Sequence, residues 1–149
     1  GKIFSPLLVL NSPFRESTLR LASAKLGKPI LVFEGGESNR FDYKSIKEGL
    51  NGCLRILHHY KMIKTEVKST PTVFLKKSSW VRAKSSGLFH TTKKSGTRVK
   101  KGDLLGTICD PFGEEENVLR ATADGFIVGV NNQPVVNQGD ALIHIGVEK

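Results

Sequence analysis

The feature that most constrains the fold is an internal repeat in the second half of the 149-residue chain. The segment VRAKSSGLF, residues 81–89, aligns with LRATADGFI, residues 119–127, at a shift of 38. The segment VKKGDLLGTI, residues 99–108, aligns with VNQGDALIHI, residues 136–145, at a shift of 37. Neither copy is large enough to bury a core alone, so we expect a pseudo-twofold sandwich in which each copy covers the other's apolar face.

Each copy carries a glycine-aspartate pair, Gly102-Asp103 in the first and Gly139-Asp140 in the second. Glycine tolerates positive φ, and an aspartate carboxylate accepts hydrogen bonds from nearby backbone amides. The pairs therefore predict tight turns, and we interpret both aspartates as structural rather than catalytic.

The first half of the chain has helical periodicity instead. Residues 13–26 predict a short amphipathic helix, and residues 43–60 predict a longer one that Asp42 caps. Gly49 and Gly52 lower the helix propensity of the second segment, and we expect them to allow close packing against a sheet.

Between these helices, residues 30–33 (ILVF) form a continuous apolar run of the kind found in parallel strands that are covered on both faces. A single strand cannot form a sheet, so either the chain is the C-terminal part of a longer protein or the strand pairs with another copy. We divide the chain into residues 1–66, a linker with a first strand at 67–78, and a β domain at 79–149.

Charge and composition exclude some functions. The formal net charge is +9, but the basic residues are scattered and there are only two tyrosines and one tryptophan to stack on bases, so we expect no nucleic-acid partner. No apolar run approaches the roughly 18 residues of a membrane span, so we expect a cytoplasmic protein without a membrane partner. Cys53 and Cys109 lack CxxC spacing and suggest neither a disulfide nor a metal site.

The repeated V-x-x-G-D-x-L-x-x-I pattern, over about residues 79–147, resembles the barrel-sandwich hybrid of biotinyl/lipoyl carriers. In such carriers a lysine in the hairpin between the two halves takes the cofactor. The corresponding hairpin here, CDPFGEEENV at 109–118, contains no lysine. We therefore expect neither biotin nor lipoate.

Together with the first 66 residues, the pattern resembles the C-terminal part of the succinylglutamate desuccinylase/aspartoacylase family. The resemblance rests on the order of FEGGE (33–37), GLNGCLRILHHYKM (49–62), DPFGE (110–114) and the second copy of the repeat. Family members are zinc-dependent amidohydrolases with a carboxypeptidase-like α/β domain and a β domain over the active-site entrance. The implied fold class is a helix-strand-helix fragment of that α/β domain, followed by an all-β barrel-sandwich hybrid.

The resemblance assigns Glu34 as the general base that takes a proton from zinc-bound water and returns it to the leaving amine. The alternative is a solvated glutamate at a strand-to-loop junction. Arg20 and Arg40 are candidates for holding a substrate carboxylate, because a guanidinium group offers a bidentate fork. Their alternative is a surface or interdomain ion pair, and we expect Glu37 to pair locally.

Zinc ligands are the main departure from the family. Members bind zinc through a His-x-x-Glu pair and a second histidine, all before the catalytic glutamate. No histidine precedes Glu34, and His58, His59, His90 and His144 show no such spacing. We therefore expect zinc only in an intact parent enzyme, no metal ligand in this chain, and no hydrolysis by the chain alone.

The predicted function is that of a C-terminal fragment of a zinc-dependent hydrolase, cleaving an amide or ester bond of a small N-acylated amino acid or amine. We expect the protein to form a homo-oligomer. The main alternative is a non-enzymatic β-sandwich module for interaction or dimerisation. A third class, a basic nucleic-acid binder, would show steeply salt-dependent binding.

Overall fold

A computed structural model describes residues 1–114 and 116–148 of the chain. The chain divides into two compact units, Gly1–Val73 and Phe74–Lys149, here called unit 1 and unit 2. Among the residues described, no helix combines the length and the apolar character that a bilayer crossing requires.

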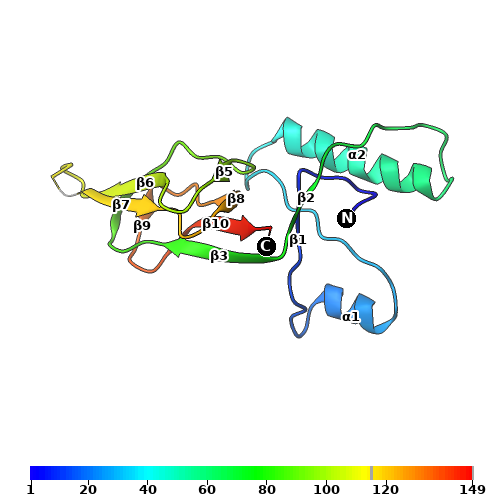
Figure 1. Ribbon diagram of the computed structural model, residues 1–149, viewed down its shortest axis with the longest axis horizontal. Coiled ribbons are helices and arrows are strands. Elements are labelled where there is room, and N and C mark those ends of the chain that lie inside the picture. The colour runs from blue at the N-terminus through cyan, green and yellow to red at the C-terminus, as the bar shows by residue number, and fades with distance from the viewer. Residues whose placement is uncertain (115, 149) are drawn as a thin grey trace. The chain divides into compact units, whose positions relative to one another are not determined.

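Unit 1 contains two helices and little β structure (Figure 1). Its elements are β1 (Leu8–Leu10), α1 (Leu19–Lys25), α2 (Tyr43–His59) and the start of β2 (Val73–Leu75), which forms a two-stranded sheet with β1. The Asp42 carboxylate caps α2 by accepting hydrogen bonds from the backbone N–H groups of Lys44 and Ser45, at 3.0 and 3.1 Å. The helix predicted for residues 43–60 and its cap are therefore confirmed.

The first helix is confirmed but is shorter than predicted. Ser17 has a φ of 60°, which interrupts a helix, and Thr18 supplies the cap by accepting a hydrogen bond from the backbone of Leu21 at 3.3 Å. At the other end, Gly27 has a φ of 65°, the left-handed conformation that commonly ends a helix.

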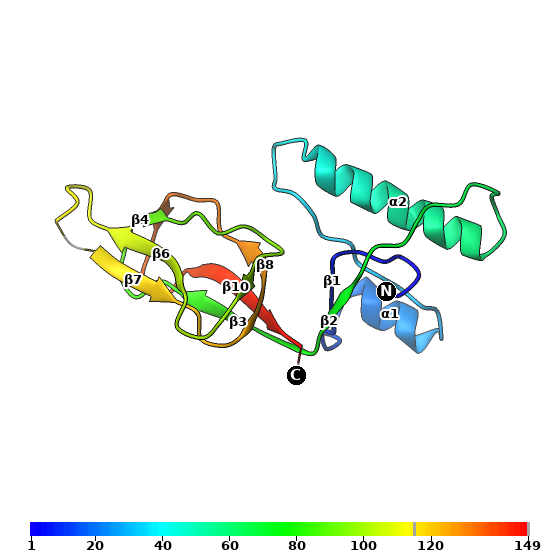
Figure 2. The ribbon, with the colours of Figure 1, turned by 45° about the horizontal axis from the view of Figure 1, so that its top comes forward.

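The strand predicted for residues 30–33 is absent from the structure. That segment runs as a plain trace between the helices in Figure 2, with Leu31 51% and Val32 58% exposed. A strand needs a hydrogen-bonding neighbour, and no described strand of the chain pairs with this one. The predicted α/β layer is therefore wrong, and Gly52 of α2 packs against the ring of Phe4 rather than against a sheet.

Unit 2 consists of two four-stranded antiparallel sheets. Its strands are β3 (Lys77–Arg82), β4 (Gly87–His90), β5 (Arg98–Val99), β6 (Leu104–Cys109), β7 (Glu116–Arg120), β8 (Gly125–Val130), β9 (Val135–Val136) and β10 (Ala141–Val147). The sheet orders are β3-β10-β8-β5 and β7-β6-β4-β9. The repeat makes β3, β4, β5 and β6 equivalent to β7, β8, β9 and β10, in that order. Replacing each strand by its equivalent turns one sheet order into the other. Each sheet thus takes two strands from each copy.

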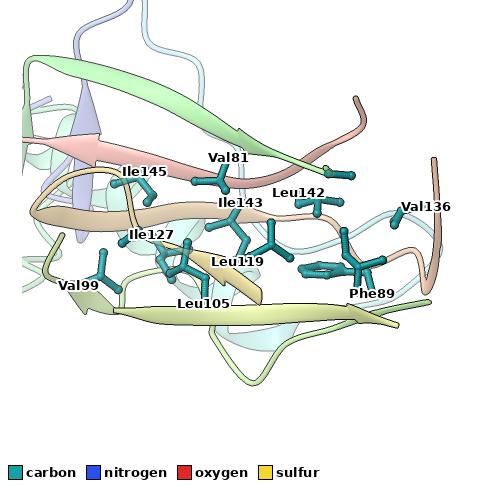
Figure 3. Packing of buried hydrophobic residues seen from close by; sticks show 13 residues of the cluster. Val81, Phe89, Val99, Leu105, Leu119, Ile127, Val136, Leu142, Ile143 and Ile145 are labelled. Atoms are coloured by element: carbon teal, nitrogen blue, oxygen red, sulfur yellow. The ribbon is translucent and has the colours of Figure 1, made fainter. Parts of the chain in front are cut away.

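The core of unit 2 lies between its sheets, whose labelled side chains point toward one another in Figure 3. Equivalent positions of the two copies are buried alike: Leu105 and Leu142 are 1% and 0% exposed, and so are Ile108 and Ile145. Full burial of such a side chain contributes about 1.5–3 kcal/mol. The shared core therefore explains why the apolar positions of the repeat match.

The two glycine-aspartate turns are confirmed. Gly102 and Gly139 have φ values of 91° and 92°, which favour glycine. Each aspartate carboxylate accepts a hydrogen bond from the backbone N–H three residues earlier, at 2.8 Å for Asp103 and 2.7 Å for Asp140. Both aspartates are therefore part of the turn structure.

The arginine-alanine pair of each copy holds the turn of the other copy. Arg82 Nη1 donates to the Gly139 carbonyl at 2.8 Å, and Arg120 Nη1 donates to the Gly102 carbonyl at 3.1 Å. The alanine after each arginine exchanges two backbone hydrogen bonds with the same turn, at 2.8–2.9 Å. These contacts interlock the two copies into one unit.

Candidate functional site

A shallow depression of about 430 Å³ in unit 1 lies between residues 33–42 and the start of α2. It is lined by Phe33, Gly35, Gly36, Arg40, Phe41, Asp42, Ser45, Ile46 and Gly49. The predicted site residue Arg40 is one of these. Glu34 lies between two lining residues in the chain but does not itself line the depression.

Glycine at position 35 lets this loop approach α2 closely. A Cβ atom at Gly35 would lie 3.0 Å from the Cβ of Ser45, and one at Gly36 would lie 3.0 Å from the Cβ of Asp42. Gly36 also has a φ of 78°. The space that the two missing side chains leave is thus taken up by the start of α2 and its cap.

Asp42 is the acid with the clearest electrostatic perturbation in the depression. The backbone N–H of Ser45 and its hydroxyl, which lies 3.1 Å from Asp42 Oδ2, hold the pKa of the Asp42 carboxyl below its ordinary value. Asp42 is therefore ionised at neutral pH and occupied as a helix cap.

Glu34 is exposed, and no described group donates a hydrogen bond to its carboxylate. It stands on an irregular segment rather than at the end of a rigid strand. The role of Glu34 as a general base stays a prediction, because the described residues neither position its carboxylate nor engage it in another interaction.

The two predicted substrate-binding arginines are in different surroundings. Arg20 Nη2 donates to the carbonyls of Ser12 and Pro13 at 2.6 and 2.9 Å, and its guanidinium carbon lies 5.5 Å from the centroid of the Phe14 ring. Arg20 thus fastens the preceding loop to α1. The role of Arg20 and Arg40 in substrate binding stays a prediction.

Arg40 lies at the depression, where its Nε is 3.3 Å from Glu37 Oε1 and its side chain is 78% exposed. An exposed pair of this kind contributes little to stability, so Arg40 can exchange Glu37 for another carboxylate at low cost. Of the three predicted site residues, the structure brings Arg40 and the segment that carries Glu34 together at one place.

Metal ligands do not gather in the part of the chain that the structure describes. No group of three or more histidine, cysteine, aspartate or glutamate side chains among those residues is placed to hold a metal ion. His58 and His59 end α2, while His90 and His144 lie on β4 and β10. The residues at positions 1–114 and 116–148 therefore do not fit a zinc site.

Arg55 organises unit 1 and was missed by the sequence reasoning. It is buried on α2, and its guanidinium donates to the carbonyls of Phe4, Lys68 and Ser5 at 2.9, 3.0 and 3.2 Å. A signal was present, because the arginine interrupts the apolar sequence CLRIL. A buried charge in such a run must have partners elsewhere in the chain.

No protein-family model matches the sequence, and no curated protein is detectably similar to it. Solved structures do match. The product-bound ectoine utilization protein EutE (DoeB) from Ruegeria pomeroyi is 24% identical, with a TM-score of 0.83, over 98% of this chain and 47% of its own.

Two further structures match over 99% of this chain. The succinylglutamate desuccinylase/aspartoacylase from Rhodobacter sphaeroides is 21% identical with a TM-score of 0.85, covered over 48% of its length. The succinylglutamate desuccinylase from Silicibacter sp. TM1040 is 22% identical with a TM-score of 0.82, covered over 47%. The chain therefore spans about half the length of these solved structures and shares their fold.

This match also corrects the second part of the predicted fold class. In the residues that the structure describes, the chain is mostly β, with two helices, a two-stranded sheet and two four-stranded antiparallel sheets. It has the fold of the aspartoacylase-type structures rather than a biotinyl/lipoyl barrel-sandwich hybrid. The glycine-aspartate pattern reports local turns, which different β folds share, so it did not determine the fold class.

Proposed function

We propose that this chain is the C-terminal portion of a hydrolase of the succinylglutamate desuccinylase/aspartoacylase family. The intact enzyme would remove the acyl group from a small N-acylated amino acid or amine, with zinc as its metal. The single observation that carries the proposal is the shared fold, which extends over 98–99% of this chain but only about half of each matched structure.

The exposed apolar surface of unit 1 supports a larger parent protein. Leu31 and Val32 are more than half exposed, and so are Ile46 and Leu50 of the neighbouring helix. Exposed apolar side chains in such number on one small unit are consistent with cover by another part of the protein. Residues 30–33 also have the composition of a central strand, which would form once neighbouring strands are present.

In the parent enzyme, this chain would supply Glu34 as a proton acceptor and Arg40 as a partner for a substrate carboxylate. Arg20 would steady the loop before α1 or bind substrate directly. Because the described residues offer no ligand set for zinc, the metal would be held by the other part of the enzyme. This chain alone would then be inactive.

The location, the oligomeric state and the substrate of the enzyme are expectations from composition and from the family rather than from the geometry. We expect a cytoplasmic enzyme that forms a homo-oligomer and takes a small acylated substrate. We also expect neither biotin nor lipoate, since the chain does not have the carrier fold and residues 109–118 contain no lysine.

The test compares the protein encoded by the complete gene with the 149-residue chain. Both are incubated with zinc and a panel of N-acyl amino acids, and the released amine is measured. We expect release by the complete protein only, and a loss of about 10²-fold or more in the rate on Glu34→Gln. Glu16→Gln, which changes an exposed glutamate in the same unit, should leave the rate unchanged.

Two results would contradict this proposal. Hydrolysis by the 149-residue chain that Glu34→Gln abolishes would show that the chain needs no further part. A gene without an H-x-x-E motif upstream of residue 1 would instead favour the non-enzymatic interaction module.

A further inference from the structure

A second hollow, of about 420 Å³, lies in unit 2 between β3 and β7 and is here called the edge groove. β3 and β7 are edge strands of the two sheets and correspond to each other in the repeat. The buried side chains of Val81 and Leu119, which are equivalent positions, line it from the core side. The groove therefore lies where the two copies of the repeat face each other.

Two equivalent arginines, Arg82 and Arg120, also line the edge groove. Each uses only Nη1 in holding the turn of the other copy, so the remaining donors of each guanidinium are unused by described groups. Neither arginine has a described carboxylate within ion-pair distance. The groove thus contains two anchored cations with no direct carboxylate partner among the described residues.

The two copies differ at the other lining positions. Trp80 stands where the second copy has Val118, and Lys84 stands where it has Thr122. Trp80 is 43% exposed and stacks on the ring of His144, with 4.5 Å between centroids and 6° between planes. Both copies have the arginine, and the first copy adds Lys84 as a third cation and Trp80 as a ring stacked on His144. This combination is what we expect of a binding site.

We propose that the edge groove binds a small, multiply charged oxyanion between Arg82 and Arg120, with Lys84 as a third contact. Guanidinium forks match carboxylate and phosphate geometry, and an ammonium group adds a point charge. The volume lies within the range of about 300–1,000 Å³ that small-molecule sites occupy. The anion would pair with three cationic side chains that have no described carboxylate within ion-pair distance.

Trp80 is the only tryptophan of the chain, so its fluorescence reports on the groove directly. The 149-residue chain is titrated with malonate and, separately, with inorganic phosphate, at an ionic strength kept constant with sodium chloride. We expect a saturable change with at least one of the two. Saturation by malonate alone identifies a dicarboxylate ligand, and saturation by phosphate alone identifies a phosphate-bearing one.

Lys84→Gln tests the site without disturbing the turns, because the Lys84 side chain makes no hydrogen bond to a described group. We expect it to weaken binding by about tenfold, the effect of losing one charge-assisted contact. Lys94→Gln removes the same charge from an exposed position outside the groove and should leave the affinity unchanged. The absence of saturation with both anions, or equal affinities of the wild type and Lys84→Gln, would overturn the proposal. Equal weakening by both substitutions would also overturn it.

Discussion

Replacing Arg55 by methionine should destabilise unit 1 and leave unit 2 unchanged. Arg55 ties α2 to the N-terminal segment through the carbonyls of Phe4 and Ser5, and to the following segment through the carbonyl of Lys68. Methionine keeps the aliphatic packing of the side chain but cannot donate a hydrogen bond. The substitution therefore isolates the contribution of the guanidinium group.

The magnitude follows from three hydrogen bonds of 2.9–3.2 Å made by a buried cation. A hydrogen bond to a charged group contributes about 1.5–3 kcal/mol, but the three share one guanidinium whose burial is itself costly. We therefore expect a net loss of about 3 kcal/mol in the free energy of unfolding rather than the full sum. With a slope near 1.5 kcal/mol per molar, the urea midpoint falls by about 2 M.

The two units can be followed separately in one urea titration. Both helices lie in unit 1, so far-UV circular dichroism reports mainly on that unit, whereas Trp80 fluorescence reports on unit 2. Arg55→Met should lower only the first midpoint. Lys47→Met, at an exposed position of the same helix, should move neither. An unchanged helical midpoint in Arg55→Met, or an equal fall of both midpoints, would refute the reasoning.

Three further predictions concern the helix cap, the helix packing and a turn. The folded-state pKa of Asp42 is lowered, so its stabilisation of α2 should be present above its ordinary pKa of 3.8 and lost as the pH falls through the lower folded value. Asp42→Ala should remove that pH dependence from the helical dichroism, and a persisting dependence would assign it to another group. Gly52→Ala should lower the urea midpoint of the helical signal, because the added Cβ would collide with the Phe4 ring. Alanine by itself favours a helix by about 1 kcal/mol, so a raised midpoint would contradict the predicted collision. Gly139→Ala should lower the free energy of unfolding of unit 2, followed by Trp80 fluorescence, by about 1–2 kcal/mol, because residue 139 has a φ of 92°. Gly129→Ala is the control, since position 129 has room for a Cβ, and equal effects would exclude backbone strain as the cause.

Part of the site could be read from the sequence, and part could not. The order of FEGGE and DPFGE pointed to the family whose solved structures match the chain. The same reasoning proposed Glu34, Arg20 and Arg40, and it anticipated the local pairing of Glu37, which Arg40 makes. It did not anticipate that backbone carbonyls engage Arg20. Such partners depend on how the loops fold back, which residue type alone does not specify.

By itself, the sequence determined the features whose causes are local. Asp42 caps α2 because its own neighbours donate the hydrogen bonds, and the glycine-aspartate turns form from four consecutive residues. Tertiary structure decided the features that require distant partners. Residues 30–33 have the composition of a strand, yet they are not one here, because β structure exists only where a neighbouring strand supplies hydrogen bonds. Likewise, Arg55 acquires its partners, and the edge groove its lining, only when segments far apart in the sequence meet.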